Sequence, residues 1–210
     1  MPSHSQNIFP PEWNLADHWN VVMKTQAPAP ADVRPRYVER TFALQVASVP
    51  GAQSANYRIE ARAADSPDEP IYELSYRADF TLERVTRRDG AGAEQTLLSN
   101  GNQPFIYYER RLPVIPDFPM SGPAGAAGRR EFTIGGNRAV QEMQVTGKQA
   151  RIELQRIEAM GSLRVVMEWT AGEPWWSTIQ CTENPPAGAP VPGHVVASGY
   201  LLKGSIVHKE

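Results

Sequence analysis

Apolar and polar residues alternate strictly along several segments of the chain, and this alternation constrains the fold more than any other feature. In the segment 57–63, apolar side chains at the odd positions alternate with arginine and glutamate. The segment 72–83 repeats the pattern, with apolar residues at each even position. Because successive side chains of a strand point to opposite faces, both segments are predicted to be strands with one buried and one solvated face. The second is either one long bent strand or two strands joined at residues 77–79.

Similar segments recur along the rest of the chain, and short turns separate most of them. The pairs Asp89-Gly90 and Asn100-Gly101 tolerate the positive φ angles of tight hairpins, which places consecutive strands side by side. The segment 150–158 is favoured as a strand, although its apolar spacing also fits a short helix. The further expected strands are 18–25, 40–49, 94–99, 105–111, 131–136, 138–145, 163–169, 177–182 and 194–207.

These patterns predict an all-β fold, a single antiparallel meander of about 10–12 strands with little helix. The sheet is expected to curl into a half-barrel or a closed barrel. Residues 1–17 are expected to form an N-terminal arm, and residues 18–210 a single β-domain. With 210 residues, the chain is long enough to bury a core without disulfides or metal.

Three long proline-rich loops interrupt the meander, at residues 26–36, 112–130 and 184–193. Loops of this length in a compact domain are usually functional or disordered. The middle loop begins with apolar residues that include Phe118 and ends in glycine and alanine. We expect it to be pinned at its start and mobile at its end, which makes it a candidate flap over a barrel mouth or an open sheet face.

The charge balance limits the classes of partner. Lysine and arginine total 21 against 23 aspartate and glutamate residues, so no overall attraction to nucleic acid is expected. No apolar run approaches the roughly 18 residues of a membrane-spanning helix, and the N-terminus lacks the pattern of a signal peptide. The sequence as it stands fits a cytoplasmic protein, but an exported protein without its signal would look the same. The single cysteine, Cys181, excludes an internal disulfide and is expected to be a structural thiol.

The sequence contains no strong catalytic signature. It lacks the serine elbow G-x-S-x-G, the zinc motif H-E-x-x-H and the phosphate-binding glycine motifs. The four histidines lie at the extremes of the chain without the local spacing of metal ligands. We therefore expect a protein without catalytic residues, metal or cofactor. A hydrolase site assembled from distant residues such as Asp117 and His194 is the enzymatic alternative.

The five tryptophans are the most distinctive candidates for a ligand site. Trp13 and Trp19 flank the start of the first strand, and Trp169, Trp175 and Trp176 flank a turn near the end of the chain. Trp169 is expected to end one strand and the pair Trp175-Trp176 to begin the next, so the pair should face opposite sides, with one indole in the core and the other exposed or facing a cavity. Curling or closure of the sheet would gather all five into one cluster, serving either core packing or a ligand. The candidate ligand-binding residues are Trp13, Trp19, Phe118, Trp169, Trp175 and Trp176.

Several short segments resemble bacterial envelope proteins. The opening IFPPEWNLADHWNVVM is similar to the start of many envelope β-proteins, in which a proline-x-tryptophan segment leads into glycine-aspartate-x-tryptophan; here Ala16 stands in place of the glycine. The later segments YELSYRADFTLERV, LPVIPDFPM and EWTAGEPWW resemble lipoprotein-like proteins with the half-barrel of the lipoprotein carrier LolA. The resemblance implies a curled sheet whose concave face holds an acyl chain or another apolar molecule, and it implies no catalytic residues. Helices usually cover such half-barrels, whereas this sequence leaves the loop 112–130 as the candidate cover.

Two functions are therefore expected from the sequence. The first is a non-catalytic binding or carrier domain for an apolar, lipid-like ligand in the cell envelope. The second is a structural or interaction subunit that uses sheet edges and proline-rich loops to contact a protein partner or another copy of itself.

Overall fold

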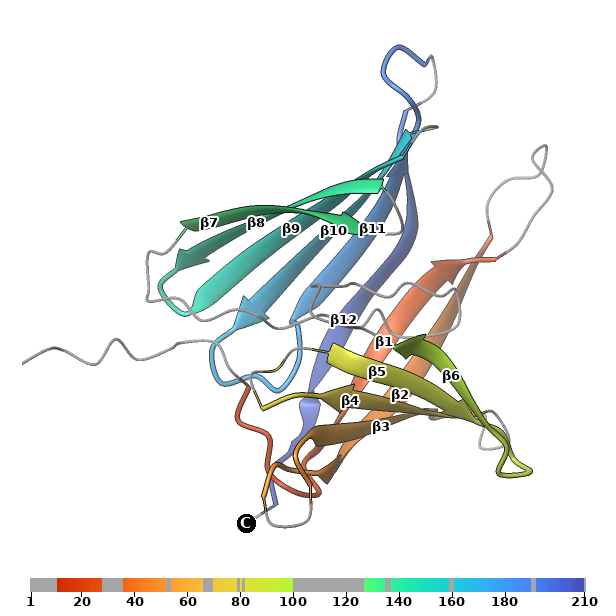
Figure 1. Ribbon diagram of the computed structural model, residues 1–210, viewed down its shortest axis with the longest axis vertical. Helices are drawn as coiled ribbons and strands as arrows, with labels where there is room; N and C mark the ends of the chain where they lie inside the picture. The colour runs from red at the N-terminus through yellow and green to blue at the C-terminus, as the bar shows by residue number, and fades with distance from the viewer. Residues whose placement is uncertain are drawn as a thin grey trace, which may run out of the picture. The chain divides into compact units, whose positions relative to one another are not determined.

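The chain forms β-strands in the computed structural model, and the described residues contain no helix (Figure 1). The predicted strand 105–111 and Phe118 lie outside the described residues. The residues that the structure describes are 11–27, 36–51, 54–65, 70–78, 80, 82–99, 127–134, 137–158, 161–189 and 192–209.

Twelve strands occur in the described part of the chain, and they belong to one sheet. Each ladder whose register is given is antiparallel, which confirms the predicted all-β antiparallel fold. The strands are β1 (His18–Gln26), β2 (Tyr37–Ser48), β3 (Tyr57–Ala63), β4 (Ile71–Tyr76), β5 (Leu82–Arg88), β6 (Glu94–Ser99), β7 (Ala127–Ile134), β8 (Asn137–Thr146), β9 (Gln149–Glu158), β10 (Gly161–Thr170), β11 (Thr178–Asn184) and β12 (His194–Val207).

The order of the strands is that of a meander whose first and last strands are neighbours. It runs β6-β5-β4-β3-β2-β1-β12-β11-β10-β9-β8-β7. Strands that follow one another in the chain are therefore adjacent in the sheet, except β6 and β7, which form its two edges. The sheet of described strands is open between these edges, so the closed-barrel alternative does not apply to it.

Contacts divide the chain into two compact units, which we describe separately. Unit 1 comprises Met1–Pro11, Thr25–Tyr37 and Met120–Tyr200; unit 2 comprises Glu12–Lys24, Val38–Pro119 and Leu201–Glu210. Strands β7 to β11 lie within unit 1, and β3 to β6 lie within unit 2. The described residues 12–17 of the expected N-terminal arm belong to unit 2.

Local sequence explains most strand boundaries. The segment 72–83 forms two strands, because a turn at 77–80 closed by the bond from Phe80 N–H to Arg77 O separates β4 from β5. The predicted Asp-Gly turn joins β5 to β6, and the Asp89 carboxylate accepts bonds from the N–H groups of Ala91 and Ala93. The segment 150–158 is a strand, as favoured. The predicted loop 112–130 extends too far, because β7 already begins at Ala127 and pairs with β8 from there on.

Candidate ligand-binding site

Buried side chains cross the neighbouring strands of unit 1 in continuous rows on one face of the sheet. Directly paired residues of an antiparallel ladder share a face, so the register defines these rows. All members are buried except the half-buried Met143. From β8 toward β12, the first row is Gln141, Leu154, Val165, Cys181 and Ala197; the second is Met143, Ile152, Met167 and Ile179; the third is Val145, Ala150 and Trp169. We call these three rows the apolar face of unit 1.

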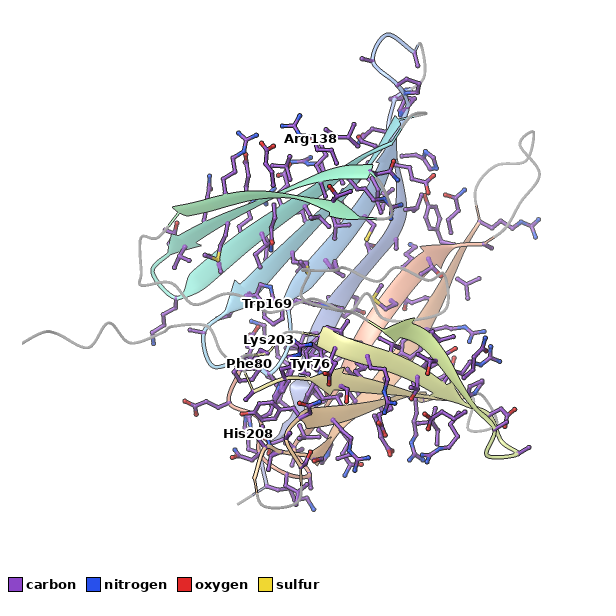
Figure 2. All side chains as sticks on the ribbon, in the orientation of Figure 1. Tyr76, Phe80, Arg138, Trp169, Lys203 and His208 are labelled. Atoms are coloured by element: carbon purple, nitrogen blue, oxygen red, sulfur yellow. The ribbon has the colours of Figure 1, made fainter. Side chains whose placement is uncertain are left out.

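Ion pairs cover the opposite face of the same strands. Arg164 donates two hydrogen bonds of 2.7 Å to Glu153, and this interaction lowers the pKa of the Glu153 carboxyl. Arg138 bonds Glu131 at 2.8 Å and likewise lowers the pKa of that carboxyl. Figure 2 shows Arg138 among the charged side chains that stand on this side of the strands. This face is therefore solvated, and the sheet of unit 1 is amphipathic.

Unit 1 has no second layer of regular structure among its described residues. Its strands all belong to one sheet, and neither a helix nor another sheet is found in its described segments. A sheet with one apolar face needs a further element or molecule against that face. Because the side chains of the apolar face are nevertheless buried, no helix or second sheet among the described residues of unit 1 accounts for their burial.

Cys181 lies in the middle of the first row, between Val165 and Ala197. It is fully buried, and burial raises the pKa of its thiol to about 12. A thiol with this pKa is almost entirely protonated at neutral pH and reacts slowly. Its position fits the expected structural thiol, and it makes Cys181 a natural reporter for the apolar face.

The prediction that Trp175 and Trp176 face opposite sides of a strand is wrong. The strand β11 begins only at Thr178, so both tryptophans lie in the connection after β10. Both side chains are fully buried, and their ring centroids are 6.5 Å apart at an interplanar angle of 52°. Outside a strand, adjacent residues are not forced to opposite faces, so two neighbouring indoles can share one core.

Hydrogen bonds hold that connection in a defined shape. Ser177 N–H donates to Glu168 O at 2.7 Å, and the Ser177 hydroxyl donates to the Glu173 carboxylate at 2.6 Å. Gly172 supplies a positive φ of 86° in the turn. The connection comprises residues 171–177 and is longer than the predicted reversal at 170–174.

Unit 2 contains the other two tryptophans in an aromatic cluster around Trp13. The Trp13 and Trp19 rings are stacked with centroids 6.3 Å apart. The Trp13 ring also meets Tyr57, Tyr76 and Phe80 edge-on at 5.2 to 5.4 Å. Figure 2 shows Tyr76 and Phe80 close together in this unit.

The five tryptophans thus fall into two groups, one in each unit. Each has at most 4% of its surface exposed. A ligand would contact these indoles only by entering a core. An apolar sheet face was expected from the sequence, but of its residues only Trp169 was named for a ligand site; the alternation of Ile179 and Cys181 within β11 was the signal that could have added others.

A buried carboxylate ties the N-terminal turn of unit 2 to the end of the described chain. Asp17 is fully buried and accepts hydrogen bonds from the N–H groups of Asn14 at 3.0 Å and Lys209 at 2.8 Å. His208 Nδ1 lies 3.2 Å from the same carboxylate. Burial alone would raise the pKa of Asp17, but these hydrogen bonds bring it below its usual value of 3.8. We call this group the Asp17 clamp.

Comparison of the chain with protein-family models, curated proteins and solved structures finds no match. Among the described residues, no group of three or more histidine, cysteine, aspartate or glutamate side chains is arranged to hold a metal ion. That part of the chain likewise contains no helix long and apolar enough to cross a membrane. Of the two residues named for a hydrolase site, His194 is an exposed residue 3.9 Å from Glu183, and Asp117 lies outside the described residues.

Proposed function

We propose that the protein is a non-catalytic binding or carrier protein for an apolar, lipid-like ligand, which the apolar face of unit 1 holds. The observation that supports this proposal is a continuous apolar face across five neighbouring strands, with no helix or second sheet in the described part of that unit. The resemblance to half-barrel envelope carriers, in which a curled sheet holds an acyl chain, points to the same class of ligand.

The chemistry of the face suits an alkyl chain. Its rows are built almost entirely from aliphatic, sulfur-containing and aromatic side chains, which offer dispersion contacts and few directed hydrogen bonds. Each methylene of a ligand that is buried there contributes about 0.8 kcal/mol. Because these side chains are already buried without a ligand, a ligand must displace the contacts that bury them. Its affinity therefore reflects the difference between the apolar contacts it makes and those it displaces.

The Cys181 thiol allows a direct test. Protein purified without detergent is examined by native mass spectrometry for a co-purified mass, and the rate of labelling by N-ethylmaleimide is measured with and without added oleic acid. Since labelling requires the thiol to become accessible, a ligand that occupies the face and covers Cys181 slows it in proportion to its degree of saturation. We expect oleic acid to slow labelling severalfold.

A thiol on the opposite face is the matched control. Gln180 is the exposed neighbour of Cys181, so a Gln180→Cys, Cys181→Ala variant places a single thiol on the polar face of the same strand. Oleic acid should leave its labelling rate unchanged. An unchanged rate at Cys181 together with the absence of a co-purified mass would contradict the proposal.

The open sheet order favours a second candidate, an interaction subunit that pairs through a sheet edge. Edge strands present backbone groups that can pair with another chain unless they are protected. The edge strand β7 carries exposed side chains such as Arg129 and Glu131, with 59% and 46% of their surface accessible. A Thr133→Pro variant should abolish a complex formed through β7, and light scattering that shows only monomer for the unmodified protein at all concentrations would argue against this candidate.

A further inference from the structure

A pocket of about 310 Å³ lies in unit 2, and none of its lining residues belongs to the apolar face of unit 1. Its volume is at the lower end of the range of small-molecule sites, roughly 300–1,000 Å³. The side chains that give it its chemistry come from three neighbouring strands and from the end of the described chain. They are His18 and Asn20 of β1, Gln45 of β2, Glu60 and Arg62 of β3, and Lys209.

The register of the sheet and the Asp17 clamp bring these groups together. Gln45 is paired directly with Glu60, and Arg62 pairs with Ala43, which also lines the pocket. At the far end, the bond from Lys209 N–H to Asp17 fixes the Lys209 backbone beside the start of β1. The pocket is thus built on a sheet face and bounded by a fixed segment of chain.

A side-chain hydrogen bond connects β1 to β12 beside the pocket. Asn20 N–H donates to the Ser205 hydroxyl at 2.8 Å, and that hydroxyl donates to Leu202 O at 2.6 Å. A side chain thus takes the place of a backbone carbonyl as the acceptor for Asn20.

Hydrogen-bond donors outnumber acceptors among the groups that line the pocket. Glu60 is the one carboxylate of the lining, and Arg62 bonds it at 2.7 Å while Arg88 lies 3.7 Å away from its other oxygen. The remaining groups are the Lys209 ammonium, the His18 ring and the carboxamides of Asn20 and Gln45. Glu60 is paired with its arginine partners, and the buried Asp17 carboxylate beside the lining residues Ala16 and His18 already accepts bonds from two backbone N–H groups. The charge of the Lys209 ammonium therefore remains to attract an anion.

We propose that this pocket binds a small anionic molecule through its carboxylate or phosphate group. Lys209 and the second edge of the Arg62 guanidinium contact the anionic group, and the carboxamides of Asn20 and Gln45 hydrogen-bond to polar atoms next to it. Carboxylates and phosphates share the geometry that arginine and lysine recognise. Whether the ligand carries a carboxylate or a phosphate is therefore determined by experiment.

Isothermal titration calorimetry of the full chain with inorganic phosphate, succinate and the uncharged succinamide, at constant ionic strength, tests the proposal. We expect one of the two anions to bind with a dissociation constant below about 1 mM, and succinamide not to bind. The variants Arg62→Gln and Lys209→Gln should each weaken binding about tenfold, as expected for loss of a charged hydrogen bond.

Arg138→Gln is the matched control. Arg138 has the same exposure as Arg62, 59% against 58%, and the same kind of bond to a glutamate, but it lies in unit 1. It should leave the affinity unchanged. The absence of binding by either anion, or an equal loss in Arg138→Gln and Arg62→Gln, would overturn the proposal; circular dichroism of each variant verifies that the fold is retained.

Discussion

Ala16 has a φ of 70°, in the left-handed region that L-residues enter at a cost of roughly 1–2 kcal/mol and glycine enters freely. The conformation is fixed on both sides, because Ala16 N–H donates to Val46 O and Val46 N–H donates to Asp17 O. It is also the position at which the resemblance to envelope proteins leads one to expect glycine. The sequence thus pointed to this residue, whereas only the backbone angle explains why glycine suits it.

Replacing Ala16 by glycine should therefore stabilise the protein. The relief of strain exceeds the entropy that glycine adds to the unfolded chain, and we expect a net gain of about 0.5–1 kcal/mol in the free energy of unfolding. Urea denaturation measures it. Ala43→Gly, within the strand β2, is the control and should destabilise; a loss of stability in both variants would show that Ala16 is not strained.

Gly161 illustrates the opposite case. Its φ is 137°, and a Cβ atom there would collide with the backbone carbonyl of Asn184 on the neighbouring strand. Gly161→Ala should destabilise the protein by more than about 2 kcal/mol in urea denaturation, since backbone strain and a steric clash add together. Gly172→Ala separates the two effects, because Gly172 also has a positive φ but has open space around its Cβ position. Equal losses in the two variants would mean that the clash is relieved by a small shift.

At the level of elements, the alternation of residues predicted where the strands lie but not how the segments between them fold. The segment that contains Trp175 and Trp176 looks extended by its composition, yet Gly172 and the bonds of Ser177 shape it into a compact connection. The register that builds the apolar face depends in part on the turn at Gly147, which joins β8 to β9, and on the connection 171–177, which joins β10 to β11. These pairings depend on turn conformations that apolar periodicity does not encode.

The Asp17 clamp joins two distant elements, and its effect on stability should depend on pH. A carboxylate with a lowered pKa in the folded state stabilises above its ordinary pKa, and that contribution is lost as the pH falls through the lower value. Asp17→Asn should cost about 1–3 kcal/mol at pH 7, because charge-assisted bonds from two backbone N–H groups are weakened. The difference in the free energy of unfolding between the two proteins should stay constant from pH 7 down to about the usual value of 3.8 and shrink below it. A difference that is independent of pH would show that the charge of Asp17 does not matter.

For the whole molecule, the strand order was only partly predictable. Short turns favoured a meander, and curling of the sheet implied that the first and late strands approach each other, as β1 and β12 do. The break between β6 and β7 was not predicted, because alternation describes the faces of a strand and not its edges. The sequence pattern did not predict the division into two units either, since strands with the same alternation contribute to both.

The continuity of β12 has a consequence for the cooperativity of unfolding. This strand contributes Val196 and Ala197 to the core of unit 1 and Leu201 to that of unit 2, so neither unit can lose it without affecting the other. Met167→Ala removes a fully buried side chain of unit 1 and should cost about 2–5 kcal/mol. We expect the free energy of unfolding to fall by the same amount in both units. Thiol labelling of Cys181 in urea measures it in unit 1, and hydrogen exchange of the buried amides of β3 and β4 measures it in unit 2. A loss confined to Cys181 would instead mean that β12 can separate from unit 1 while unit 2 stays folded, and that each unit is a cooperative element of its own.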